Sequence, residues 1–300
     1  KKSLDAGLVE FEGQWVTTAA RAKLARGLIE VSGQWVPREE GELLRRGFKK
    51  YKDRWYARQE YLEIRSQWEE AYEARTEHYD IRTNRSEEFA AELAKVAEAA
   101  YRDLRDLYGG DEPRLPGKER MTLWAFARFE DYRAYCVEHK CEDHLQAAGF
   151  ARSDANVVVG WDKTDSTQQF LQTMAHEAAH LYFFRVRPSS RPPSWYCEGM
   201  ATQLEGFEWK GTEYVFNRVS ASRLPFLKDS IRKNKLLPLD VLLAGDALKL
   251  INSDGEKALV FYAECWALFY YLTHTNNPEV RAAFEKYRKA IDAGTDRPLT

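Results

Sequence analysis

The chain has 300 residues, of which 44% are hydrophobic and 31% charged, so it can bury a sizeable core. This composition excludes a wholly disordered, collagen-like or low-complexity protein. Its 45 basic and 47 acidic residues give a net charge of −2, which excludes the broad positive field of a general nucleic-acid-binding protein. The most apolar stretch, residues 258–272, contains Glu264 and is too short to cross a bilayer, so no membrane span is expected.

The chain begins with a 20-residue repeat marked by glycines and tryptophans at matching positions. The marker residues are Gly7, Gly27 and Gly47, together with Trp15, Trp35 and Trp55. Each copy shows an apolar/polar alternation, a two-residue turn and a strand that carries the tryptophan, which predicts a β-hairpin. The turns are expected at residues 12–13, 32–33 and 52–53. The polar remainder of each copy predicts a short helix, and the third copy continues into a helical stretch that reaches about Arg75.

These repeats are expected to form a small β-hairpin/helix module over residues 1–75. Its tryptophans either cover neighbouring hairpins or present a platform for a glycan or protein partner. The pattern changes after Thr76, where a second domain over residues 76–300 is expected.

The second domain is predicted to have strands at residues 78–83, 121–129 and 156–160 and helices at about 87–108 and 130–148. Ser86 is the expected N-cap of the first of these helices. From Asp165 onward nearly all of the predicted structure is helical. Strands come first and helices after, which predicts an α+β fold with a small mixed sheet rather than a regular βαβ alternation.

The string His176-Glu177-Ala178-Ala179-His180 is an HExxH pattern inside residues 168–185, which contain neither Gly nor Pro. Histidines four residues apart lie on one helix face about 6 Å from each other, so both rings can bind one metal ion. Glu177 then lies beside the first ligand and faces the water that the metal would activate. The chain has only six histidines, so the chance of such a string is roughly 0.01.

A catalytic zinc site needs a third protein ligand and an open fourth position. Glu198 supplies that ligand best, because residues 181–197 are enough to end the first helix and bring a second helix back against it. Glu205, about two helical turns further on, is the competing ligand, and Cys197 is a weaker one. Thr202 is the candidate for a side chain that supports a histidine ligand.

The motif His176-Glu177-Ala178-Ala179-His180, followed by Trp195-Tyr196-Cys197-Glu198-Gly199-Met200-Ala201, resembles the gluzincin metallopeptidases, specifically the largely uncharacterised peptidase-MA-like bacterial families. The resemblance covers about residues 77–276. It implies a zincin-like fold in which His176, His180 and Glu198 bind Zn²⁺. Glu177 corresponds to the general base. The resemblance further implies a peptide or protein substrate, an extracytoplasmic location, and a cleft edge formed by a strand similar to residues 156–160.

Many gluzincins also carry a tyrosine or histidine that stabilises the oxyanion. The resemblance points to Tyr262, because the corresponding family helix packs behind the zinc site. An ordinary core role for Tyr262 stays open, as do Tyr214 and His274 as alternatives.

A second group, Cys136, His139, Cys141 and His144, has a spacing that superficially suits a metal. If the segment is helical, Cys141 lies about 140° around the helix from Cys136, so ligation by all four would require unwinding. Three interpretations stay open: a structural zinc, a disulfide between the two cysteines, and unlinked thiols beside surface histidines.

Two hypotheses of function follow from the sequence. The first is a zinc-dependent peptidase with Glu177 as general base. The alternative is a catalytically inactive zincin-fold protein that binds cell-wall polymer or a protein partner through its tryptophan repeats. The complete set of His176, His180, Glu198 and Glu177 favours the first, because a decayed enzyme commonly loses its general base.

Overall fold

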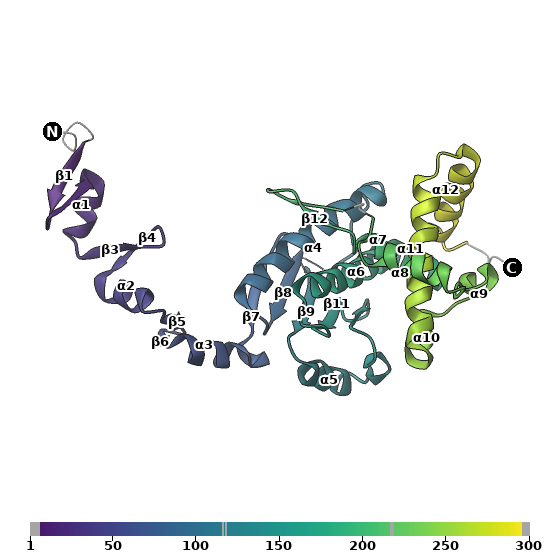
Figure 1. Cartoon of the computed structure of the whole chain (residues 1–300), viewed down its shortest axis with the longest axis horizontal. Coiled ribbons are helices and arrows are strands. Elements are labelled where there is room, and N and C mark those ends of the chain that lie inside the picture. Colours follow the sequence, from purple (N-terminus) through teal and green to yellow (C-terminus); the bar gives the residue numbers. More distant parts are fainter. Residues whose placement is uncertain (1–6, 116, 118, 217–218, 296–300) are drawn as a thin grey trace. The chain divides into compact units, whose positions relative to one another are not determined.

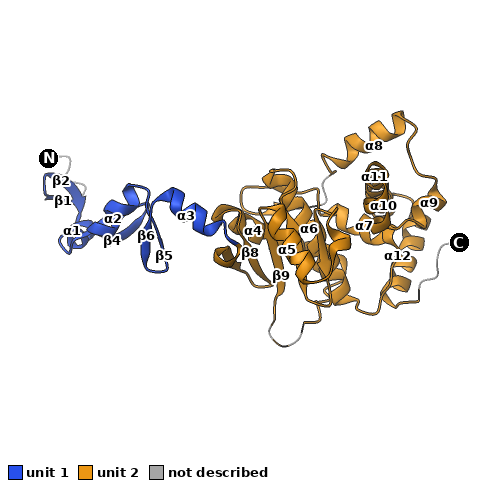
Figure 2. Cartoon of the chain, turned by 90° about the horizontal axis from the view of Figure 1, so that it is seen from below, with its two compact units in different colours: residues 1–67 blue, residues 68–300 orange. Residues whose placement is uncertain are grey.

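The structure is a computed structural model that describes residues 7–115, 117, 119–216 and 219–295. The chain divides into two compact units, Lys1–Gln67 and Trp68–Thr300 (Figure 2). The sequence pattern places this division between residues 75 and 76. In the structure it lies earlier, because β7 (Tyr72–Arg75) pairs antiparallel with β8 (Tyr79–Thr83) and so belongs to the sheet of the second unit.

In the first unit, every 20-residue repeat forms a β-hairpin followed by a short helix (Figure 1). The elements are β1 (Leu8–Phe11), β2 (Gln14–Thr17), α1 (Thr18–Leu24), β3 (Leu28–Val31), β4 (Gln34–Pro37), α2 (Arg38–Arg45), β5 (Lys49–Tyr51), β6 (Arg54–Tyr56) and α3 (Arg58–Arg65). Both turn residues of each hairpin have positive φ, as at Glu12 (48°) and Gly13 (78°). That is the turn geometry whose twist matches the flanking strands. The predicted hairpins and their turns are therefore confirmed.

The tryptophans of the repeats are partly exposed. The side chain of Trp15 is 48% exposed, and the Lys23 ammonium of the first repeat lies 4.8 Å from the centre of the Trp35 ring of the second. Trp15, Lys23 and Trp35 help to line a cavity of about 470 Å³ within this unit. Neighbouring repeats thus contact each other through a lysine on a tryptophan face, while Trp15 keeps about half of its surface in solvent.

The second unit is built on a five-stranded mixed sheet with the order β10-β11-β9-β8-β7. Its remaining strands are β9 (Met121–Phe126), β10 (Gly149–Arg152) and β11 (Val157–Trp161). The three central strands run parallel, and the two edge strands β7 and β10 are antiparallel to their neighbours. The three predicted strands form this parallel centre, whereas β7 was expected to be helical and β10 was not predicted.

Alternating residues of the central strands face two different apolar clusters. On β11, Val158 packs into the main core with α4 (Glu87–Leu107) and α6 (Thr167–Val186), whereas Val157 and Val159 pack with Tyr132 and Tyr135 of α5 (Phe129–Glu138). Helices therefore cover both faces of the sheet (Figure 1). As predicted, the Ser86 side chain caps α4 by accepting a hydrogen bond from the Phe89 N–H.

Helices dominate the rest of the second unit. They are α7 (Ser194–Gln203), α8 (Arg223–Arg232), α9 (Leu239–Leu243), α10 (Ala247–Ser253), α11 (Gly255–His274) and α12 (Pro278–Asp292). A small hairpin of β12 (Glu208–Trp209) and β13 (Tyr214–Val215) interrupts this series. The predicted α+β class is confirmed by the mixed sheet, the helices and the N-terminal hairpin module.

Helix α5 is shorter than the predicted helix at residues 130–148. It ends at Glu138 because Lys140 adopts a positive φ of 54° and the Cys141 N–H bonds back to the Cys136 carbonyl. Cys136 and Cys141 are buried and free, so the disulfide interpretation does not hold in this structure. Among the described residues, Cys136, His139, Cys141 and His144 form no group of ligand atoms that could hold a metal. None of the helices described here has the length and apolar composition needed to cross a membrane.

Candidate metal centre

Helix α6 presents the two histidines of the HExxH string side by side. The helix starts at the N-cap Ser166 and runs without a break to Val186, so residues 176 and 180 share one face. The Nε2 atoms of His176 and His180 are 3.1 Å apart. His176 is buried and His180 is partly buried.

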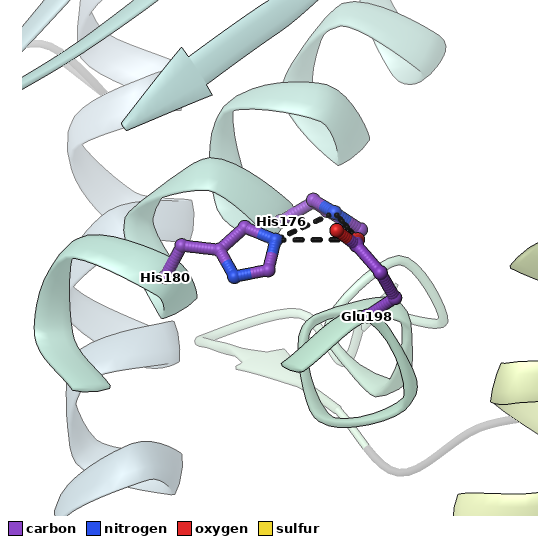
Figure 3. Close-up of side chains that lie close together, drawn as sticks. All are labelled: His176, His180 and Glu198. Carbon is purple, nitrogen blue, oxygen red and sulfur yellow. Dashed lines mark hydrogen bonds and ion pairs between the residues drawn. The ribbon is translucent and has the colours of Figure 1, made fainter. Parts of the chain in front are cut away.

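Helix α7 brings Glu198 to the same point (Figure 3). Its Oε2 atom lies 3.1 Å from Nε2 of His176 and 3.3 Å from Nε2 of His180. Gly199 allows this placement, because a Cβ atom there would approach the Cys265 carbonyl oxygen and the Phe269 Cβ of α11 to 2.8 Å. Glycine therefore lets α7 pack closely on α11, with Glu198 directed at the histidines.

The three ligand atoms fit a metal ion. A tetrahedral zinc with bonds of 2.0–2.1 Å has its ligand atoms about 3.3 Å apart, close to the 3.1 to 3.3 Å separations found here. Among the histidine, cysteine and acidic residues that the structure describes, one group has ligand atoms that all lie within 4.8 Å of one another. This group is His176, His180 and Glu198. These three residues, the metal group, are at least partly buried and could hold a metal ion.

Glu177 follows the first histidine and is partly exposed to the cavities beside the metal group. Removal from bulk water raises the pKa of its carboxyl group, and the neighbouring His176 and His180 counteract that effect only in part. A carboxylate with a raised pKa is better able to accept a proton and pass it on.

A buried ion pair that the sequence analysis missed supports His176 from its other side. Oε1 of Glu205 lies 3.0 Å from Nδ1 of His176, and Arg223 donates to both oxygens of Glu205 at 2.7 Å. When Nδ1 donates its proton to Glu205, Nε2 keeps a lone pair for a metal. Glu205 thus lies outside the converging group as the residue that orients His176, and not as the competing third ligand.

Burial alone would lower the pKa of His176, but hydrogen bonds to Glu198 and Glu205 outweigh burial and raise it to about 10. Burial would raise the pKa of Glu205, but Arg223 and His176 lower it to about 2. The two carboxylates therefore stabilise positive charge at His176, and a metal cation at Nε2 would supply the same charge.

Thr202 does not support a histidine. Its hydroxyl donates to the backbone carbonyls of Glu198 and Gly199, at 2.7 and 3.0 Å, within its own helix. That expectation was wrong because a threonine in a helix interior readily bonds a carbonyl of the preceding turn. Cys197 is buried and free, and it is not part of the converging ligand group.

Tyr262 of α11 lies beside the metal group. Its ring centre is 6.0 Å from that of His176, and the guanidinium carbon of Arg223 lies 5.3 Å from the Tyr262 ring. The two alternatives lie elsewhere: Tyr214 donates to Glu92, and His274 contacts Tyr270 near the exposed end of α11. Of the three, Tyr262 is the residue that lines the cavities next to His176.

A family model described as "Protein of unknown function (DUF1570)" matches residues 170–292. The match spans less than half of the chain, and it contains His176, His180, Glu198 and Glu205. It begins within α6, after the five-stranded sheet, and ends at the last residue of α12. No curated protein matches the chain.

Two cavities, of about 570 and 310 Å³, adjoin the metal group. One wall includes Gly149, where β10 begins, and the other comes from α10 and α11. The strand at residues 156–160 was expected to form the cleft edge, but β11 lies inside the sheet and β10 is the edge strand. A Cβ on Gly149 would lie 3.2 Å from the Glu177 side chain, so glycine brings β10 close to Glu177.

Proposed function

We propose that the chain is a zinc-dependent peptidase whose site is similar to that of the gluzincins. The observation that carries the proposal is the close triangle of His176 Nε2, His180 Nε2 and Glu198 Oε2, with Glu177 beside it on a cavity. Two imidazoles and one carboxylate form a donor set that catalytic zinc sites use with an open fourth position.

A bound zinc ion would polarise the scissile carbonyl and lower the pKa of a water molecule to about 7. Glu177 accepts a proton from the attacking water and delivers it to the leaving nitrogen. Because water is the nucleophile, no covalent link between substrate and protein forms. The hydroxyl of Tyr262, which burial keeps protonated by raising its pKa well above the usual value, donates to the developing oxyanion.

Glu205 and Arg223 hold His176 in one orientation and one tautomer. Neither residue takes part in proton transfer. Their fixed geometry supports the proposal because a positioned ligand loses little freedom when it binds a metal.

The test is hydrolysis of a panel of unlabelled proteins and peptides by the zinc-loaded chain, with and without a chelator. We expect cleavage that chelation abolishes. A Glu177→Gln variant should retain its metal and its thermal unfolding midpoint but lose at least about 10²-fold in kcat, since an amide cannot accept the proton. Activity at a comparable kcat in Glu177→Gln would show that Glu177 is not the base.

The exposed Trp15 and its adjacent cavity favour a second role for the repeats, the binding of a glycan or protein partner. If the zinc-loaded chain cleaves nothing across a broad panel, that binding role becomes the leading proposal. A Trp15→Ala variant that binds such a partner as tightly as the unchanged chain would count against it.

A further inference from the structure

The two cavities beside the metal group are parts of one groove. They share six lining residues, Ala147, Gly149, His176, Glu177, Ile251 and Tyr262. Since His176 and Glu177 are among the shared residues, the cavities meet where bond cleavage would take place. Each is as large as a typical ligand pocket of about 300–1,000 Å³, so there is room for substrate on both sides of that point.

One part of the wall of the smaller cavity is apolar. Phe150 of β10, Phe184 of α6 and Leu248 of α10 line it, and the imidazole of His144 is stacked on Phe150 at 4.2 Å. An apolar substrate side chain would lose little hydration free energy on entering this side of the groove.

The larger cavity is lined in addition by two basic side chains. Arg223 lines it, but both oxygens of Glu205 already bind its guanidinium group. Lys163 also lines it, and its Nζ donates to the Gln146 carbonyl at 3.0 Å. Within the described part of the chain, Lys163 forms no ion pair with a carboxylate. Its charge is therefore available to an acidic group of a substrate.

We propose that the groove holds an extended peptide segment across the metal group, so that the chain cleaves internal peptide bonds. An apolar side chain occupies the smaller cavity, and an acidic side chain faces Lys163 in the larger one. The inference rests on the proposed peptidase function and adds the substrate class. A peptidase that removes terminal residues would instead have substrate space on only one side of the metal group.

The first experiment compares peptides that are acetylated and amidated at their ends with the same peptides carrying free termini. Mass spectrometry should show blocked peptides cut internally at rates within about threefold of the free ones. Release of single residues from free termini, with blocked peptides intact, would overturn the inference while leaving the peptidase proposal standing.

A binding measurement separates the two proposals further. Fluorescently labelled blocked and free peptides are titrated onto the zinc-loaded Glu177→Gln variant, whose binding does not depend on turnover. Similar dissociation constants for the two forms support an open groove even if no hydrolysis is found. Binding that requires a free terminus contradicts the open groove.

The charge of the larger cavity is tested with Lys163→Glu. We expect kcat/KM for peptides with an acidic residue on that side to fall about tenfold, and that for lysine-substituted peptides to rise. Lys286→Glu, which changes an exposed lysine of α12 that lines neither cavity, is the matched control and should change neither value. An unchanged preference in Lys163→Glu would remove Lys163 from the account of specificity.

Discussion

Single residues set the orientation of His176 in the candidate metal site. The Nε2 atom of His176 is directed at the metal position because Glu205 fixes Nδ1, and Arg223 in turn fixes Glu205. Each of these side chains is at least mostly buried, so breaking one contact leaves an unpaired charge in the interior. We therefore expect the affinity for a metal to depend on residues outside the group of three ligand atoms.

We expect Glu205→Gln and Arg223→Met to weaken zinc binding by about 10- to 100-fold, because His176 loses its fixed orientation. Competition with a chromogenic chelator measures this change. Thr202→Val is the control, since its hydroxyl bonds only carbonyls of α7 and should leave zinc affinity within about twofold. If Thr202→Val weakens zinc as much as Arg223→Met does, the loss reflects general destabilisation rather than orientation.

At the scale of elements, the site depends on how closely α7 can pack on α11. Gly199 is the contact point, where any β-carbon would press on the α11 backbone at residue 265. Side-chain adjustment cannot relieve a clash with a backbone oxygen, so the helices would have to move apart. That movement would also carry Glu198 away from the histidines.

Gly199→Ala is therefore expected to lower the free energy of unfolding by about 1–3 kcal/mol and to weaken metal binding. Urea unfolding followed by circular dichroism measures the first effect. Gly255→Ala is the matched control: it lies in the first turn of α11 with no atom within 4 Å of a new Cβ. That substitution should leave stability unchanged or raise it slightly. Equal destabilisation by the two variants would contradict the packing argument.

Elements fixed by local pattern were predictable, and those fixed by long-range contacts were not. His176 and His180 were found from their spacing alone, and the hairpin turns from their sequence. Strand β10 has only four residues, and its edge position depends on pairing with β11, which no local signal encodes. Arg223 of α8 lies 18 positions after Glu205 in the sequence, so only the tertiary fold reveals its role.

At the scale of the whole molecule, the repeats and the candidate metal site belong to two different compact units. Trp68 belongs to the second unit, since its ring lies 4.1 Å from that of Phe126 and its carbonyl accepts a hydrogen bond from Arg82. Strand β7 then covers one edge of the sheet. A functional second unit should therefore need residues from 68 onward but not the repeats.

A chain of residues 68–300 is expected to fold cooperatively and to bind zinc with the affinity of the full chain. A chain of residues 77–300 lacks β7 and exposes the edge of β8, so it should unfold at lower temperature or aggregate. Differential scanning calorimetry with metal analysis checks both chains. Loss of zinc from residues 68–300 would show that the repeats contribute to the metal site.

The central claim is that His176, His180 and Glu198 together hold one zinc ion. Elemental analysis of the purified full chain tests it most directly, alongside His176→Ala, His180→Ala and Glu198→Ala, with His274→Ala as a control at the exposed end of α11. We predict one zinc per chain in the unchanged protein and in the control, and a large loss of zinc in each ligand variant. A chain without stoichiometric metal, or a His176→Ala variant that keeps full occupancy, would contradict the claim.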